Sequence, residues 1–135
     1  MDLVNAIDVS SSGMKAQTAR IKVISENLAN SESGAPVKGG DPYRRKTIGF
    51  KTVLDRVNGT QKVAVSGVSV DRSPFRIKFD PANPVADEKG YVELPNVNAV
   101  IEMSDMREAQ RSYEANLTVI ESSRGMIRST LELLK

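Results

Sequence analysis

The 135-residue sequence predicts an α+β protein in which long N- and C-terminal helices pair as a coiled coil, with a small antiparallel β unit and extended loops between them. Apolar residues recur every seven positions near each end, as they do along the seam of two paired helices. In the middle, apolar and polar residues alternate with the period of two typical of half-buried strands. We therefore divide the chain into an N-terminal helix (1–33), a loop and β unit (34–95) and a C-terminal helix (96–135).

The first helix is expected from residue 2 to about residue 30. Its apolar ladder has four members seven residues apart: Ile7, Met14, Ile21 and Leu28. The serines at 10–12 and Gly13 weaken this helix, because serine and glycine have low helix propensity. The helix must therefore draw its stability from packing. It should end at Asn30, before a loop rich in glycine and proline.

The middle segment is expected to form one β unit. Alternation of apolar and polar residues predicts strands near 48–54, 62–70, 75–79 and 91–94. Asn58-Gly59 is a hairpin turn signal, and a change of phase at Ser66-Gly67 suggests a β-bulge. The apolar side chains that we expect to cluster within this unit are Phe50, Phe75, Ile77 and Phe79.

The last helix is expected to run for about 35 residues after Pro95, with Asn96 or Asn98 as its N-cap. Its main ladder is Met106, Tyr113, Ile120, Ile127 and Leu134, and a second row holds Met103, Leu117 and Leu131. Gln110 and Arg124 interrupt that second row. Either they are polar positions within a seam that set register or partner, or they lie at the edge of the apolar face of an ordinary amphipathic helix.

Composition argues against several classes of function. The chain has no cysteine and no histidine, which excludes disulfides, thiolate nucleophiles and imidazole bases and argues against a structural zinc site. A net charge of +2 is too balanced for an electrostatic nucleic-acid binder. The single basic run, Arg44-Arg45-Lys46, is interpreted as a solvated turn. No apolar run approaches a membrane span, and the start lacks the features of a cleaved secretory signal.

Two short patterns resemble catalytic or phosphate-binding motifs and fail on their missing parts. Ser12-Gly13-Met14-Lys15 matches S-x-x-K, but the S-D-N and K-T-G elements that accompany it are absent. The glycines from Gly34 to Gly40 are not followed by the Lys-Ser/Thr of a phosphate loop. We expect no enzyme activity, no cofactor, no small-molecule substrate, no nucleic-acid partner and no direct membrane insertion.

Two segments carry a specific resemblance. Residues 25–30 (SENLAN) and 108–116 (EAQRSYEAN) resemble the terminal signatures of the bacterial flagellar basal-body rod and hook family, A-x-N-L-A-N and E-A-Q-R-x-Y-E-A-N. Segments 41–46, 83–87 and 90–98 extend the resemblance to the short proximal-rod members. Ser25 replaces the usual alanine, and the T-x-G-Y element of hook-like members is missing. The motif residues are Asn27, Leu28, Ala29, Asn30, Gln110, Tyr113 and Asn116.

The resemblance implies a non-catalytic subunit of the flagellar proximal rod, whose paired terminal helices pack into an inner tube and transmit torque as part of an axial drive shaft. It implies export through the flagellar type III apparatus without a cleaved signal, and a place in the periplasm-spanning basal body. The implied partners are other rod proteins, copies of the chain and the export-gate adaptor at the rod base.

The expected assembly interface consists of the ladder residues Ile7, Met14, Ile21, Leu28, Met103, Met106, Tyr113, Leu117, Ile120, Ile127 and Leu131. Asn27 and Asn30 are expected to form hydrogen bonds at the end of the first helix. A soluble coiled-coil adaptor or export chaperone remains the alternative function.

Overall fold

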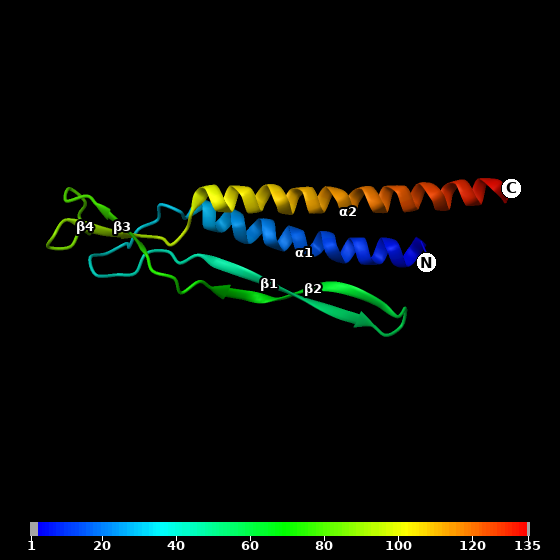
Figure 1. Cartoon of the computed structure of the whole chain (residues 1–135), viewed down its shortest axis with the longest axis horizontal. Coiled ribbons are helices and arrows are strands. Elements are labelled where there is room, and N and C mark those ends of the chain that lie inside the picture. Colours follow the sequence, from blue (N-terminus) through cyan, green and yellow to red (C-terminus); the bar gives the residue numbers. More distant parts are fainter. Residues whose placement is uncertain (1–2, 135) are drawn as a thin grey trace. The chain divides into compact units, whose positions relative to one another are not determined.

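The computed structural model describes residues 3–134, whose elements follow the order α1 (Leu3–Ala29), β1 (Lys46–Asp55), β2 (Thr60–Val70), β3 (Arg76–Phe79), β4 (Tyr91–Leu94) and α2 (Ala99–Leu133) (Figure 1). Long terminal helices with small sheets between them confirm the predicted α+β class. The coiled-coil geometry of the helices stays a prediction. The strands form two separate two-stranded sheets, β1–β2 and β3–β4, where the sequence indicated one β unit.

The chain folds into two compact parts. The first comprises the chain up to Ile21, Ile48–Gly67 and the chain from Arg107, and the second comprises Lys22–Thr47 and Val68–Met106. Each helix contributes residues to both parts, as does the β1–β2 hairpin, whereas β3 and β4 lie wholly in the second part. The division into segments 1–33, 34–95 and 96–135 stays a prediction.

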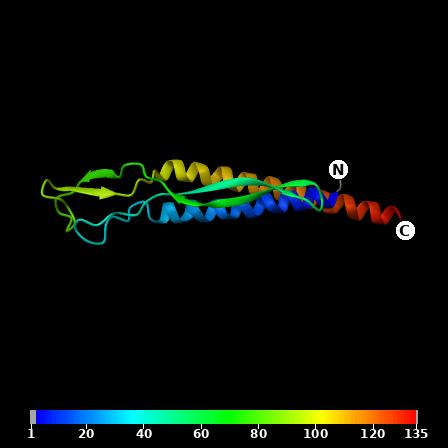
Figure 2. The ribbon, with the colours of Figure 1, turned by 90° about the horizontal axis from the view of Figure 1, so that it is seen from below.

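In the first part, α1 lies between α2 and the β1–β2 hairpin (Figures 1 and 2). On the hairpin side, the backbone N–H of Val63 donates to the Ser12 hydroxyl at 3.2 Å. On the other side, Arg20 of α1 forms an ion pair with Glu108 of α2 at 3.5 Å. Ala16 of α1 is only 3% exposed, so it belongs to the buried core of this part.

The β1–β2 hairpin turns where Asn58-Gly59 predicted. Gly59 has a φ of 65°, a left-handed conformation that glycine adopts without steric cost. Along β2, the less exposed positions are polar or small, whereas Val63 and Val65 remain 40% and 38% exposed. The hairpin therefore presents valines to its surroundings. The bulge at Ser66-Gly67 stays a prediction.

In the second part, β3 and β4 pair antiparallel, with Arg76 opposite Leu94 and Phe79 opposite Tyr91. The rings of Phe79 and Tyr91 meet edge to face, with their centroids 5.2 Å apart. Val92 of β4 and Val97, which follows this strand, are 4% and 1% exposed. These two valines belong to the small apolar core of the second part.

The predicted apolar cluster of the β unit is wrong. Phe50 belongs to β1 in the first part, and Ile77 and Phe79 of the second part are 69% and 63% exposed. Non-strand residues 71–75 separate β2 from β3, so the two runs of alternating residues join different ribbons. A two-stranded ribbon cannot bury both of its faces by itself, which leaves these side chains in contact with solvent.

The helix ends are held by asparagines. Asn98 caps α2, since its Oδ1 accepts hydrogen bonds from the backbone N–H groups of Val100 at 3.1 Å and Ile101 at 3.4 Å. At the end of α1, Asn30 Nδ2 donates to the backbone oxygen of Glu26 at 2.9 Å. Asn96, the other N-cap candidate, instead bonds to loop residues of the second part.

Candidate assembly surface and the polar cluster

The main ladders of both helices face inward. Ile7, Met14, Ile21 and Leu28 of α1 are all half-buried. On α2, Met106, Tyr113 and Ile127 are half-buried and Ile120 is 8% exposed. Leu134, which follows α2, is 79% exposed.

The second row of α2 faces outward. Met103, Leu117 and Leu131 are 53%, 38% and 58% exposed, and Gln110 and Arg124 are exposed with them. Of the two interpretations of Gln110 and Arg124, this placement favours positions outside the seam. An apolar row left open on a long helix is a candidate contact surface for another protein.

The buried row of α2 lies one residue earlier and is polar or small. Glu102 is 1% exposed, Ala109 0% and Ser123 3%, and Asn116 is half-buried in the same heptad phase. This row contains almost no apolar bulk, so apolar periodicity could not reveal it. Its members can approach α1 closely or form directed hydrogen bonds with neighbouring residues.

Asn27 of α1 uses all four hydrogen-bonding positions of its side-chain amide. Its Nδ2 donates to the Lys46 backbone oxygen at 2.8 Å and to Glu102 Oε2 at 3.1 Å. Its Oδ1 accepts from the Lys46 backbone N–H at 2.8 Å and from the Tyr43 hydroxyl at 2.9 Å. The amide thus pairs with Lys46 as a neighbouring strand would. Asn27 is 1% exposed, and burial raises the pKa of the Tyr43 hydroxyl above its ordinary value.

Glu102, at the start of α2, receives a short charged hydrogen bond from Arg45. Arg45 Nε lies 2.6 Å from Glu102 Oε1, and the same guanidinium reaches Asp71 at 3.5 Å and Asp105 at 4.0 Å. Burial acts to lower the pKa of Arg45, but hydrogen bonds to Glu102 and Asp71 raise it above its ordinary value. The buried carboxylate is therefore compensated by a permanent cation. We call Asn27, Arg45 and Glu102 the polar cluster.

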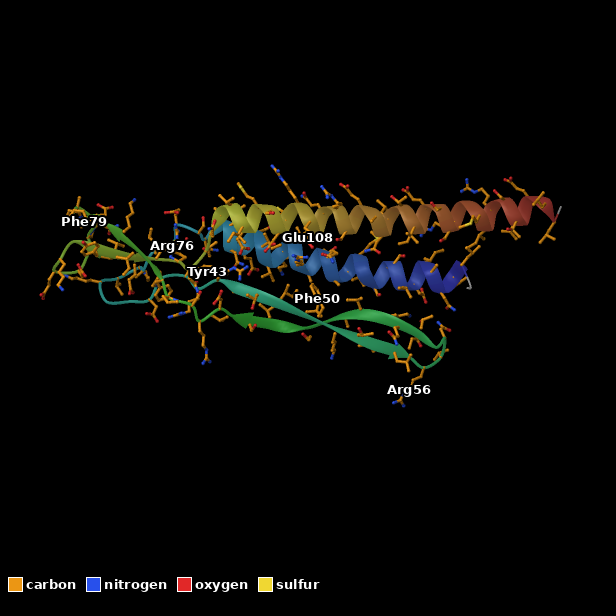
Figure 3. The ribbon with its side chains drawn as sticks, in the orientation of Figure 1. Tyr43, Phe50, Arg56, Arg76, Phe79 and Glu108 are labelled. Atoms are coloured by element: carbon orange, nitrogen blue, oxygen red, sulfur yellow. The ribbon has the colours of Figure 1, made fainter. Side chains whose placement is uncertain are left out.

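Loop residues hold the polar cluster in place. Asn96 Oδ1 accepts from the Arg45 backbone N–H at 2.8 Å, while its Nδ2 donates to the Asp71 backbone oxygen at 3.1 Å. Arg76 of β3 donates to the Pro95 and Ser31 backbone oxygens at 2.9 and 2.8 Å (Figure 3). The second part is therefore tied together largely by directed bonds to backbone atoms.

The interpretation of Arg44-Arg45-Lys46 as a solvated turn is wrong. Arg44 stacks over the Phe75 ring at 4.0 Å, Arg45 pairs with Glu102, and Lys46 begins β1 and pairs with Glu26 at 2.9 Å. The Lys46 ammonium holds the pKa of Glu26 below its ordinary value. A run of three charges suggested exposure because the carboxylate partner lies far away in the sequence.

In the first part, Asn116 of α2 lies against Gly13 of α1. A methyl group in place of the Gly13 hydrogen would lie 2.8 Å from Asn116 Nδ2, closer than van der Waals contact allows. Asn116 Nδ2 also donates to the Ser112 backbone oxygen at 3.0 Å. Gly13, which weakened the predicted helix, is thus the residue that lets the two helices approach here.

Some of the family-motif residues are buried in the single chain and others are exposed to solvent. Asn27, Leu28, Asn30, Tyr113 and Asn116 are buried or half-buried, whereas Ala29 and Gln110 are exposed. The sequence did not single out Glu102 or its pairing with Arg45. The signal that could have found it is its heptad phase, because Glu102 precedes Ala109, Asn116 and Ser123 at intervals of seven.

Within residues 3–134, no group of three or more acidic side chains is placed to hold a metal ion. In the same described range, no helix combines the length and the apolar character needed to cross a membrane.

The terminal segments match families of flagellar rod proteins. Residues 7–32 match the family described as flagella basal body rod protein, and residues 88–133 match flagellar basal body rod FlgEFG protein C-terminal. The chain is 48% identical over 136 residues to the flagellar basal-body rod protein FlgC of Agrobacterium fabrum, a match that covers 100% of this chain and 98% of that protein. The chain belongs to the FlgC family.

Other members of the FlgC family are similar along their whole length. The FlgC of Borreliella burgdorferi is 45% identical, covering 100% of this chain and 99% of its own, and that of Escherichia coli O157:H7 is 39% identical, covering 98% of each. The resemblance predicted from the terminal motifs is confirmed. Membership in the FlgC family assigns the chain to the structural proteins of the flagellar basal body.

Proposed function

We propose that this chain is a non-catalytic structural subunit of the bacterial flagellar proximal rod, which self-assembles through its terminal helices into the axial drive shaft that transmits torque. The observation that carries this proposal is the outward row of Met103, Leu117 and Leu131 on α2. These side chains follow a heptad spacing and remain open after α1 has packed against the helix. Burial of such a row needs a neighbouring helix.

The other apolar surfaces suit lateral contacts in the same assembly. Val63 and Val65 on the hairpin and Ile77 and Phe79 on the β3–β4 ribbon are exposed. In the proposed rod, these ribbons pack against adjacent subunits. We propose other rod proteins, copies of this chain and the export-gate adaptor at the rod base as its partners.

We also propose a route and a location. The subunit leaves the cytoplasm through the flagellar type III apparatus without a cleaved signal and takes its place in the periplasm-spanning basal body. A fold held by short ribbons and directed polar bonds suits a chain that has to be threaded unfolded and to fold at its destination.

A strain whose only copy of the rod gene encodes this chain tests the proposal. Basal bodies are purified with detergent washes, and the chain is sought by immunoblot in the basal bodies and in the soluble fraction. We expect it in basal bodies that carry a complete rod and hook. Recovery only in the soluble fraction, with rods complete, would support the adaptor or chaperone alternative instead.

A further inference from the structure

The two motif asparagines that lie between the helices occupy matching places. Asn27 bonds Glu102 in the second part, and Gly13 lies against Asn116 in the first. Gly13 and Asn27 are fourteen residues apart on α1, and Glu102 and Asn116 are fourteen apart on α2. Each contact therefore belongs to the same antiparallel heptad register.

We infer that these two contacts fix the register of the terminal helices, so that Asn27 and Asn116 are positioning residues within the subunit. The inference concerns the fold of a single chain and does not rest on the proposed rod function. The role that it gives to the motif asparagines lies within the subunit and is separate from the contacts between subunits proposed for the outward apolar row.

The apolar ladders alone define the register weakly. Their members repeat every seven residues, so a slip of one heptad again sets apolar side chains against apolar side chains. Such a slip moves one helix along the other by about 10 Å. Something other than the ladders must distinguish the native register from its neighbours.

The polar cluster makes that distinction through hydrogen bonds. After a slip of one heptad, Asn27 would face either Ala109 or Pro95, and neither side chain can accept from its Nδ2. Glu102 would lose the bond from the Asn27 amide and keep only Arg45 among its two present side-chain donors, although it is buried between the helices. Buried polar groups without partners are strongly disfavoured, and a polar seam position is a known means of setting register.

Gly13 and Asn116 distinguish the native register from the slipped ones through the space available to the Asn116 side chain. The same slips would bring Asn116 opposite Ala6 or Arg20, which precede and follow Gly13 by seven residues. Both carry a Cβ atom, and a Cβ at position 13 would lie 2.8 Å from Asn116 Nδ2, so that the amide would have to turn away and give up its bond to the Ser112 backbone oxygen. Of the row Ala6, Gly13, Arg20 and Asn27, only Gly13 lacks the Cβ atom that the amide would meet in its present conformation.

The register can be measured by electron–electron distance spectroscopy, because the chain has no cysteine and two introduced ones are unique. Spin labels at Thr18→Cys and Arg128→Cys lie on exposed positions of α1 and α2 in the first part. These positions are far apart along the helices, so a slip changes their separation by nearly its full length. Dilution with unlabelled chain suppresses distances between molecules.

The doubly labelled chain with no further substitution should give a single distance between the spin labels. The variant with Gly13→Ala, Asn27→Leu, Arg45→Leu, Glu102→Leu and Asn116→Ala should stay helical and show a second population displaced by about 10 Å. The matched control removes the exposed ion pair of the same two helices, Arg20→Ala with Glu108→Ala, and should keep the single distance.

If the variant with five substitutions stays helical and keeps only the original distance, the inference is overturned. A broad distance distribution in the labelled chain without these substitutions would also overturn it. Should the five-fold variant lose its helices, Gly13→Ala with Asn116→Ala decides the question. Alanine favours helix over glycine, so this pair of substitutions does not weaken α1. A single unchanged distance in it would then reject the inference.

Discussion

The two parts of the chain hold the same two helices together by different means. In the first part, apolar ladder side chains such as the buried Ile120 lie along the helices, and the ion pair between Arg20 and Glu108 is partly open to solvent. In the second part, Asn27 and Glu102 are each 1% exposed and fully engaged in directed bonds. Apolar packing stabilises the helix pair but hardly specifies which residues face one another, whereas the hydrogen bonds of the polar cluster specify this pairing.

Because of this difference, we expect the two parts to respond differently to amino-acid substitutions. Apolar contacts lose stability in proportion to the area removed. A buried charged network fails sharply when one partner is removed, yet its replacement as a whole by apolar residues is often harmless. Exposed ion pairs contribute only about 0.2–1 kcal/mol. The substitutions below test these expectations.

The largest effect is expected from Ile120→Asp in the first part. The carboxylate loses burial worth about 1.5–3 kcal/mol and meets a desolvation penalty, so unfolding free energy should fall by about 4 kcal/mol. Urea unfolding measures the loss, and swimming and hook assembly report rod incorporation, which should be abolished. Ser122→Asp, on an exposed position of the same helix, should leave all three near normal. Normal swimming with Ile120→Asp would contradict an inward-facing ladder.

The next effect is expected from Arg45→Leu in the second part. It leaves the Glu102 carboxylate buried without its cation, at a cost of about 3 kcal/mol, near the lower end for such pairs because Arg45 is itself partly exposed. Adding Glu102→Leu should restore most of the stability. Unfolding by urea measures both variants. A double variant no more stable than Arg45→Leu would show that the cluster is needed for stability as well as direction.

A smaller effect is expected from Asn27→Ala. It leaves the Lys46 backbone groups and the Glu102 carboxylate with fewer partners, at about 2 kcal/mol. Hydrogen exchange at the Lys46 amide should become faster, while that of amides in the hairpin turn should not change. Unchanged protection of Lys46 would mean that the amide pairing does not hold the start of β1.

Acid should weaken both parts modestly. A Ser73 backbone hydrogen bond lowers the pKa of Asp71, and the Lys62 ammonium lowers that of Asp55. Because the unfolded chain then binds protons first, stability is present above about pH 4 and is lost as the pH falls through the lowered pKa values. Asp71→Asn and Asp55→Asn should each flatten part of the dependence of unfolding free energy on pH between 5 and 2. Identical slopes in all three proteins would reject these assignments.

The smallest effect on stability is expected on the outward row. Leu117→Ser with Leu131→Ser should change unfolding free energy of the isolated chain by about 0.5 kcal/mol or less, because both side chains are exposed. Rod incorporation in the complemented strain should nevertheless fall strongly. A variant that assembles normally would show that this row is not the contact surface.

Periodicity predicted much of the fold and failed where partners are distant in sequence. The terminal helices, the turn at Gly59 and the α+β class followed from local pattern, because heptads and alternation are local properties. The ladder from Met106 to Ile127 is buried or half-buried within the single chain, and its place in an assembly interface stays a prediction. The second row, which contains Leu117, is exposed on the single chain, and its place in an assembly interface also stays a prediction.

The polar cluster could not be predicted from local pattern. Arg45 and Glu102 are 57 residues apart, and each alone is typical of a solvated position. Asn27 was noticed through the family resemblance and was expected to bond at the helix end, but its pairing with Lys46 depends on how a distant loop returns. In the sequence, Gly13 indicated only a weaker helix, because glycine has low helix propensity. Its contact with Asn116 of the second helix depends on tertiary packing and could not be predicted from local pattern.

A density map of an assembled basal body, with this chain traced, tests the central claim most directly. The account predicts that Met103, Leu117 and Leu131 lie buried against helices of neighbouring rod subunits, while Asn27 and Glu102 keep their contact within one subunit. A map in which the outward row of α2 still faces solvent, or in which the chain is absent from the rod, would contradict it.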